Sequence, residues 1–222
     1  MSASGSLSSL EPYRDWFGRD LDAVHADLAG LNDMVEKWQR VQNLVSRETV
    51  RAIWDRHILD SLQLLPLIFT SATEARGPMH VLDIGSGGGF PAIPLAIALK
   101  DSGVRFDLIE SNGRKCAFLN AAIREFGLAG ARVHNARIEA VDPEDVGEIN
   151  IITSRALAPL PLLLRYALPF FGPNARAYFH KGREFREELQ LADSSFAFDV
   201  VHHRSLIDPE GVILELTHLR AL

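Results

Sequence analysis

The stretch from Val81 to Ile97 reads VLDIGSGGGFPAIPLAI. A short β-rich run leads into a loop in which four of the five residues from 85 to 89 are glycine, and an apolar run with two prolines follows. Glycine lets the backbone approach a ligand closely and permits positive φ, and Pro91 suits the first turn of a helix. The stretch therefore predicts a strand, a ligand-binding turn and a helix. A purely structural strand-to-helix turn is the alternative.

Downstream of this stretch, β-rich runs alternate with helical patterns. The runs are RFDLIE (105–110), ARVHNA (131–136), INIITS (149–154) and ARAYFHKG (175–182). Such alternation predicts βαβ units and a mostly parallel sheet. Two further runs, FAFDVVHH (196–203) and VILELTHL (212–219), have only a turn between them and predict a closing antiparallel hairpin.

The first part of the chain has a different pattern. Apolar residues recur at spacings of three and four from Leu21 to Trp38 and again from Val50 to Leu65, which predicts two amphipathic helices, with Ser46 as the N-cap of the second. We expect a flexible N-terminal tail over residues 1–18, a helical extension over 19–70, a linker over 71–79 and an α/β domain over 80–222.

The composition is that of an ordinary soluble globular protein, with 47% hydrophobic and 23% charged residues in 222. The net charge of −6 argues mildly against nucleic-acid binding, although 19 of the 23 basic residues are arginine and a local basic face stays possible. The single cysteine excludes a cysteine-rich metal site, and we expect no metal. The N-terminus has no signal-peptide pattern, and no apolar run approaches the ~20 residues of a membrane span. We expect a cytoplasmic protein without a membrane partner.

Three classes of ligand are considered for the glycine loop. A P-loop is excluded because no G-K-[ST] ending is present. The pattern G-x-G-x-x-A, ending at Ala92, fits a dinucleotide fingerprint and keeps a nicotinamide enzyme open. The pattern D-x-G-x-G-x-G, typical of S-adenosylmethionine-dependent methyltransferases, consists here of Asp83, Gly85, Gly87 and Gly89. The closing hairpin also favours the methyltransferase, whereas Glu110 at the second strand's end could bind the ribose of either ligand.

Six blocks of sequence resemble a known family, the RsmG family, also called GidB. They are SRETVRAIWDRHILDSLQL (46–64), DIGSGGGFPAIPLAIAL (83–99), ESNGRKCAFLNAA (110–122), NARIEA (135–140), TSRALAPL (153–160) and HKG (180–182), within a resemblance that covers about residues 20 to 218. That family methylates N7 of a guanine in 16S ribosomal RNA. The resemblance implies a Rossmann-like methyltransferase fold, S-adenosylmethionine as cofactor, and the 16S rRNA of the small ribosomal subunit as partner.

The resemblance also implies roles for single residues. Gly85 and Phe90 would contact the methyl donor, and Arg155 would lie at the donor and substrate site and orient one of them. The other implied contacts are Ile138 and Glu139 beside the adenine, and Arg137 and Lys181 on the RNA. The sequence departs from the family pattern at Ala92, where a glycine is common, and at Asn112-Gly113 before a predicted helix.

The chemistry agrees with this resemblance. N7 of guanine carries a lone pair and no proton at neutral pH, so its methylation needs alignment rather than a general base. The N-P-P-Y pattern of exocyclic-amine methylases is replaced by S-R-A-L at 154–157. Cys116 lies in a helical pattern and is interpreted as a packed residue rather than a nucleophile. Arg155 could hold a carboxylate or a phosphate in a bidentate contact, or could instead neutralise Asp83 or Glu110.

Two other functions stay open from the sequence, a small-molecule methyltransferase and a non-catalytic ribosome-associated binding module. His57 and Asp60 lie one turn apart, and either an internal hydrogen-bonded pair or an RNA contact fits them. His202 and His203 are interpreted as structural. The basic residues between 37 and 56 alternate with acidic ones and predict a solvated helix surface.

Overall fold

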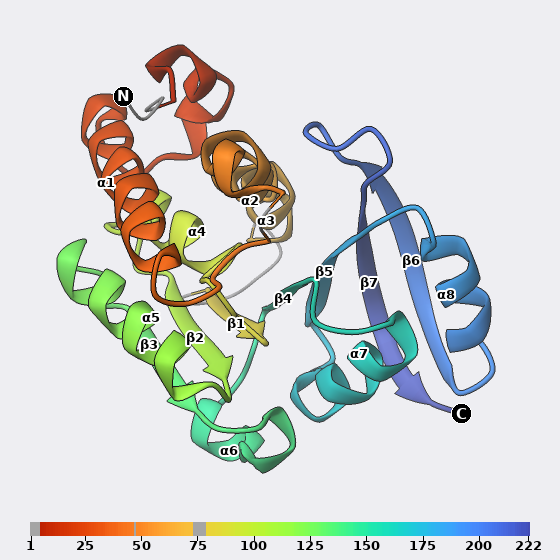
Figure 1. Ribbon diagram of the computed structural model, residues 1–222. Coiled ribbons are helices and arrows are strands. Elements are labelled where there is room, and N and C mark those ends of the chain that lie inside the picture. The colour runs from red at the N-terminus through yellow and green to blue at the C-terminus, as the bar shows by residue number, and fades with distance from the viewer. Residues whose placement is uncertain (1–4, 47, 73–78) are drawn as a thin grey trace.

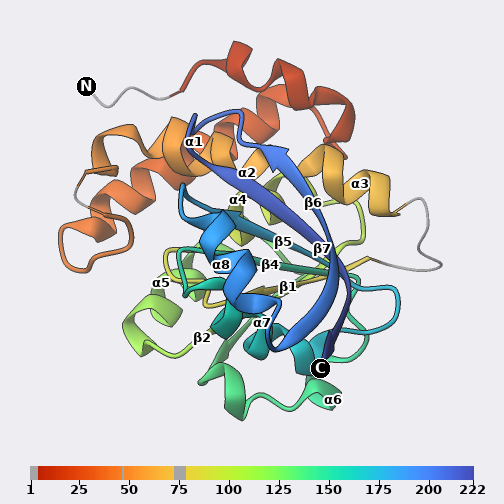
Figure 2. The same ribbon diagram turned by 90° about the vertical axis from the view of Figure 1, so that its right-hand side faces the viewer.

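The computed structural model describes residues 5–46, 48–72 and 79–222. Its strands form one seven-stranded sheet in the order β3-β2-β1-β4-β5-β7-β6 (Figures 1 and 2). The strands are β1 (His80–Ile84), β2 (Arg105–Glu110), β3 (Ala131–Asn135), β4 (Ile151–Arg155), β5 (Arg176–Lys181), β6 (Phe196–Arg204) and β7 (Val212–Ala221). The first five strands pair in parallel, and β7 lies antiparallel between β5 and β6. The predicted parallel sheet and closing hairpin are confirmed.

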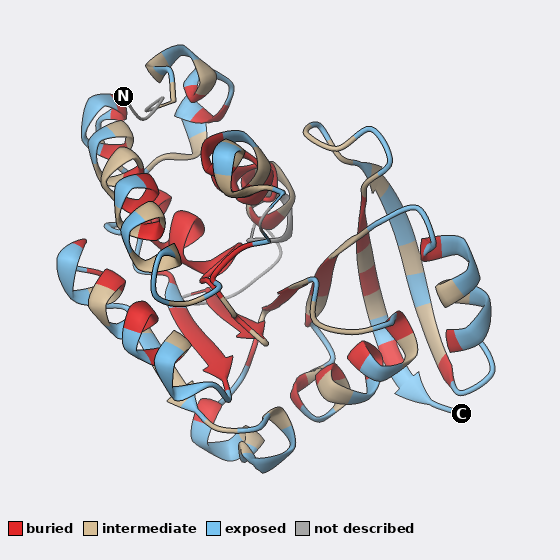
Figure 3. Ribbon diagram, in the orientation of Figure 1, coloured by how far each residue is buried: buried red, intermediate tan, exposed pale blue. Residues whose placement is uncertain are grey.

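Helices cover both faces of this sheet (Figure 1). The α-helices are α1 (Leu21–Gln39), α2 (Asp60–Leu62), α3 (Leu65–Ala72), α4 (Ala92–Ala98), α5 (Gly113–Glu125), α6 (Pro143–Val146), α7 (Leu160–Ala167) and α8 (Phe185–Ala192). Alternate residues of the central strands point to opposite faces, so that Val81 belongs to the core under α4 and α5 while Leu82 belongs to the core under α7 and α8. Figure 3 shows the contrast between the fully buried β1 and the edge strand β6, which is mostly intermediate or exposed.

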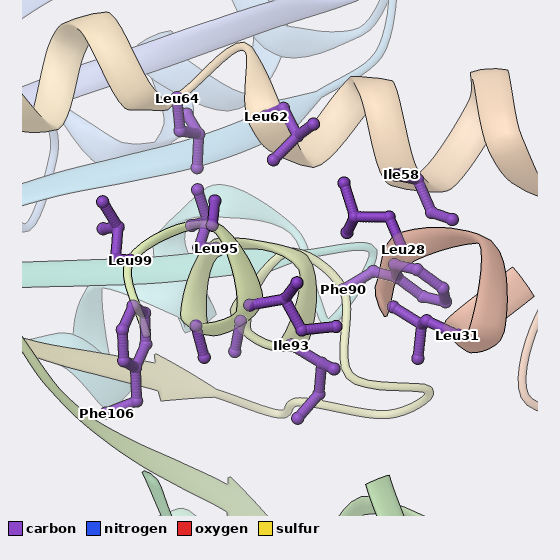
Figure 4. Close-up of a cluster of buried hydrophobic side chains, with 14 of the residues drawn as sticks. Leu28, Leu31, Ile58, Leu62, Leu64, Phe90, Ile93, Leu95, Leu99 and Phe106 are labelled. Atoms are coloured by element: carbon purple, nitrogen blue, oxygen red, sulfur yellow. The ribbon is translucent and has the colours of Figure 1, made fainter. Parts of the chain in front are cut away.

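Helices α1 and α2 of the N-terminal extension pack on α4, and the extension also contacts the sheet, where the Tyr178 hydroxyl of β5 donates to the Leu67 carbonyl over 3.2 Å. Every residue of α4 is buried, as expected for a helix that is apolar on all sides. Figure 4 shows Ile93 and Leu95 of this region between Phe106 of β2 and side chains of the helical extension, among them Leu28 and Leu62. Because α4 follows the glycine loop directly, the extension is held next to that loop.

The predicted N-terminal tail is wrong over residues 5–18, and residues 1–4 lie outside the described ranges. Two short 3-10 helices, η1 (Leu7–Ser9) and η2 (Glu11–Trp16), form here. Leu10 and Tyr13 are buried in the core, and the Trp54 indole N–H donates to the Ser9 hydroxyl over 3.0 Å. Burial of two large side chains orders a segment whose serine-rich composition suggests mobility.

The second predicted helix is not continuous. It consists of a 3-10 turn η3 (Val50–Ala52), a π-helical turn η4 (Trp54–Leu59), the short α2 and, after a turn at 63–64, α3. Helix α3 runs into the predicted linker as far as Ala72, and residues 73–78 of that linker lie outside the description. None of the helices that the structure describes is both long and apolar enough to cross a membrane.

Candidate active site

The glycine loop follows β1 at the point where the strand order reverses, because β1 lies between β2 and β4. In open α/β sheets this switch point is where ligands bind. Gly85, Gly87 and Gly89 have φ values of +69°, +58° and +83°, a region that other residues rarely adopt. The N–H groups of Gly85 and Ser86 donate to the Ile109 carbonyl over 2.9 and 3.0 Å, which fixes the loop to β2.

Gly88 has a different reason to be glycine. A Cβ built on it would lie 2.7 Å from the Leu44 carbonyl oxygen, so the loop after α1 rests directly on the glycine loop. We expect Gly88→Ala to cost about 1–3 kcal/mol of unfolding free energy, since backbone must move to admit the methyl group. Urea unfolding would measure this, with Gly172→Ala as control because nothing lies within 4 Å of the corresponding Cβ there. Equal stability of the two variants would contradict the contact.

A cavity of about 840 Å³ opens above the glycine loop. Its walls come from residues far apart in the sequence, which include Asn43–Ser46 before η3, Gly85–Gly88, Glu110 at the end of β2, Arg155 at the end of β4 and Lys181 at the end of β5. Leu157 also contributes to the wall and covers Gly85, where an added Cβ would be 2.5 Å from its Cδ1. The volume lies in the range of sites for nucleotide-sized ligands.

Glu110 is held by backbone on both carboxylate oxygens. Oε2 accepts the Gly87 N–H over 2.8 Å, and Oε1 accepts the Asn112 N–H over 2.7 Å. Each oxygen keeps a further lone pair for a ligand hydroxyl. The carboxylate is therefore preorganised at the cavity wall, and the Asn112 side chain caps α5 beside it.

Asp83 lies beneath the loop and is fully buried. Its Oδ1 accepts the Thr153 hydroxyl over 2.7 Å, whereas Oδ2 is buried and has no hydrogen-bond partner. Burial raises the pKa of this carboxyl from 3.8 to about 6, and the hydrogen bond from Thr153 opposes the shift only in part. Asp83 does not line the cavity, so its carboxylate fits a positively charged ligand through its charge from beneath the loop and not as a direct contact.

Arg155 organises a polar cluster between β4 and the helical extension. Its Nη1 donates to the Arg56 carbonyl over 2.9 Å and to Asp60 Oδ2 over 3.1 Å. Its Nη2 donates to His57 Nδ1 over 2.5 Å, and the guanidinium carbon lies 5.2 Å from the centre of the Phe90 ring. The ion pair is therefore with Asp60 and not with Asp83 or Glu110, and His57 and Asp60 both bind Arg155.

The π-helical turn explains how Arg155 reaches backbone. In an α-helix the Asp60 N–H would bond to the Arg56 carbonyl. Here the Asp60 N–H points to the carbonyls of Asp55, His57 and Ile58. The Arg56 carbonyl is therefore available to Arg155. Single π turns occur frequently at functional sites.

His57 is a neutral acceptor in this cluster. Arginine can only donate, so Nδ1 of His57 must accept, and Nε2 then carries the proton and donates to the Thr49 hydroxyl over 2.8 Å. Burial, followed by the charges of Arg155 and Arg56, lowers the pKa of His57 to about 3. The ring thus fixes the arginine and does not compete with it as a cation.

The other predicted site residues lie at the edges of the cavity or outside its lining. Lys181 lines the cavity and is half-buried; it forms an ion pair with Glu188 at 2.5 Å and donates to the Ala158 carbonyl. Ile138 and Glu139 form the 3-10 turn η5 (Ile138–Ala140) after β3, and exposed Arg137 precedes it; none of the three lines the cavity. Their predicted roles stay predictions.

Sequence reasoning missed several members of the site. His180 donates through Nε2 to the Asp60 carbonyl over 3.0 Å, and its buried Nδ1 has no partner. Lys115 places its ammonium 3.9 Å from the position of a Cβ on Gly87. The HKG block contained the signal for His180, and the basic pair 114–115 after Asn112 contained the signal for Lys115. Cys116 is buried with its pKa raised by that burial, consistent with a packed residue.

No group of three or more histidine, cysteine, aspartate or glutamate side chains able to hold a metal occurs among the residues that the structure describes.

Comparison with known proteins agrees with the geometry. A curated relative from Rhizobium meliloti, named ribosomal RNA small subunit methyltransferase G, is 43% identical over 84% of this chain and 85% of its own. The relative of the same name from Brucella ovis is 43% identical over 87% of both chains. The structure of S-adenosylhomocysteine-bound Podospora anserina methyltransferase PaMTH1 superposes with a TM-score of 0.56 at 12% identity, covering 84% of this chain and 87% of that one. It shows that the fold is the predicted Rossmann-like methyltransferase fold. The family described as GidB, rRNA small subunit methyltransferase G, matches residues 24–212, and this chain belongs to that family.

Proposed function

We propose that this protein transfers a methyl group from S-adenosylmethionine to N7 of a guanine in 16S ribosomal RNA. Membership of the GidB family supports a small-subunit rRNA methyltransferase. The single observation on which the proposal rests is the cavity in which the bare backbone of Gly85–Gly88 and the carboxylate of Glu110 face Arg155. This cavity sits at the switch point of the sheet, where the fold places its ligand.

The residues present fit a donor that is a nucleoside with an amino-acid arm. Glu110 would accept hydrogen bonds from the ribose hydroxyls, and the positive-φ glycines would admit the donor against main chain. The buried carboxylate of Asp83 would balance its positive charge. Ile138 and Glu139 after β3 would flank the adenine. When bound, the donor supplies a methyl group on a sulfonium, which is electrophilic without further activation.

The imidazole that contacts Arg155, His57, is not available as a base. His57 has its Nδ1 occupied by Arg155 and the proton on Nε2, so it takes up no proton from a substrate. A guanine N7 needs none, because its lone pair is already free. Arg155, held by three protein groups over the Phe90 ring, would orient donor or substrate for in-line transfer. Because the substrate is a small-subunit rRNA, the enzyme would act in the cytoplasm with the ribosome.

Two measurements test the proposal. Isothermal titration calorimetry is expected to show binding of S-adenosylhomocysteine and no binding of NAD or NADP. Mass spectrometry of rRNA nucleosides is expected to show less 7-methylguanosine in 16S rRNA from cells lacking the protein. Labelled donor incubated with naked 16S rRNA, 30S particles and a metabolite pool would identify the substrate form. Label in small metabolites alone, or binding of dinucleotide alone, would overturn the proposal.

A further inference from the structure

The cavity of about 840 Å³ above the glycine loop is called the donor cavity below. A second hollow of about 510 Å³ lies beside it, between the end of α1 and the start of α5. We call it the basic groove, and its lining consists of Gln39, Arg40, Val41, Gln42, Asn43, Asn112, Arg114 and Lys115. The described part of this lining contains three cations, four amide side chains and no carboxylate. Asn43 and Lys115 line the donor cavity as well, so the two hollows are neighbours and share part of their walls.

Among the residues that the structure describes, the three cations of the groove have no acidic partner. Within the described ranges, no carboxylate oxygen lies within 4.0 Å of the basic nitrogens of Arg40, Arg114 or Lys115. By contrast, Arg155 and Lys181 in the donor cavity are both ion-paired. In a chain with 29 acidic and 23 basic residues, three unpaired cations in one hollow form a local positive field that the net charge conceals.

The start of α5 strengthens this field. Arg114 and Lys115 occupy its first turn, at the positive end of the helix dipole, where cations are unfavourable. The groove also holds a donor without an acceptor, because Nε2 of Gln42 is buried and has no hydrogen-bond partner. Both features destabilise the protein when no ligand is bound. A bound anion would neutralise the cations and accept the hydrogen bond of Gln42.

The wall of the groove is preformed. The Gln39 amide accepts the N–H groups of Leu44 and Val45 over 2.7 and 3.1 Å and donates to the Val45 carbonyl over 2.9 Å. The same loop rests on Gly88 through the Leu44 carbonyl. On the groove's lining, Val41 keeps 76% of its surface exposed and offers apolar contact to a ribose or base.

We propose that the basic groove binds the phosphate backbone of the RNA strand that carries the target guanine. This inference rests on the proposed function. Arginine guanidinium groups match phosphate oxygens in bidentate contacts, and amide side chains supply further neutral donors. An RNA strand seated here would run along Lys115 into the donor cavity. The surface around Arg40, which the sequence predicts to be solvated, would therefore contact the RNA substrate.

The test compares two double variants with the same change of charge. Arg40→Gln/Arg114→Gln removes two groove cations, and Arg165→Gln/Arg220→Gln removes two exposed cations on α7 and β7. Filter binding to 16S rRNA at several salt concentrations gives the affinity and its salt slope, and calorimetry gives the S-adenosylhomocysteine affinity. We expect the groove variant to bind RNA roughly tenfold more weakly, with a slope of log K against log salt smaller by roughly 1–2. Its S-adenosylhomocysteine affinity stays at the wild-type value.

The outcomes separate this inference from the function on which it rests. Equal RNA affinity of groove variant, control variant and wild type would overturn the groove alone, and so would equal losses in both variants. A loss of S-adenosylhomocysteine affinity with RNA affinity intact would assign the groove to the donor instead. Wild-type protein that neither binds nor methylates 16S rRNA would overturn both proposals.

Discussion

Arg155→Lys is expected to reduce methyl transfer by about a hundredfold or more in a protein that still folds. Lysine keeps the positive charge and can still pair with Asp60. It cannot reproduce the fork that reaches the Arg56 carbonyl and His57 together, or the planar contact with the Phe90 ring. Misplacing an orienting group by about 1 Å is enough to cost roughly a hundredfold in rate. Single-turnover transfer of labelled methyl groups to 16S rRNA measures the effect.

The lysine variant is more informative than alanine at this position. Arg155→Ala would leave the Asp60 carboxylate with a hydrogen bond from Gln63 but without its ion-pair partner, and removal of one partner of a buried ion pair costs up to about 3–5 kcal/mol of unfolding free energy, which confounds rate with stability. Thermal unfolding of Arg155→Lys checks that the fold persists. Arg176→Lys provides the matched control, since that arginine pairs with Glu215 at 2.7 Å at the start of β5, at the opposite edge of the sheet from Arg155. Wild-type transfer by Arg155→Lys would show that only the charge is needed.

The sheet could be predicted from sequence because its signals are local. Each strand is a short β-rich run, and the glycine loop after Val81–Ile84 carries its own conformational requirement in Gly85, Gly87 and Gly89. The closing hairpin follows from two adjacent β-rich runs with a turn between them. Glu110 could be placed at the cavity for the same reason, since it simply ends a strand.

The parts that sequence reasoning missed depend on contacts across the fold. The apolar spacing around Trp54–Leu59 is that of an ordinary helix, so the sequence gives no local signal for the π turn there. The turn frees the Arg56 carbonyl for Arg155, which lies about a hundred residues later in the chain. Leu10 is buried only because helices of the extension surround it. The basic groove joins the end of α1 to the start of α5, and neither segment alone differs from an ordinary charged helix end.

Asp83→Asn is expected to stabilise the ligand-free protein and to weaken donor binding. The pKa of Asp83 in the folded protein is about 6, above its ordinary 3.8, so the folded state holds this proton more tightly than the unfolded state. Stability therefore falls as pH rises from about 4 to about 6, by about 3 kcal/mol in total for this group. Asparagine keeps the acceptor for Thr153 and carries no charge. At pH 8 the variant should unfold with a free energy up to about 3 kcal/mol higher, and the two proteins should become equal as the pH falls below 3.8.

Donor binding should change in the opposite direction. Asp83 lies beneath the glycine loop and does not line the cavity, so its carboxylate would attract the positively charged amino group of S-adenosylhomocysteine through its charge and not by direct contact. Loss of a charge interaction of about 1 kcal/mol weakens binding roughly fivefold. Because the ionised carboxyl is the attracting form, wild-type affinity should rise as pH increases through 6, while the affinity of Asp83→Asn stays flat across that window. Calorimetry at pH 5.5 and 7.5, with the exposed Asp193→Asn as control, measures both. If Asp83→Asn bound S-adenosylhomocysteine as tightly as wild type at both pH values, the buried carboxylate would have no part in holding the donor.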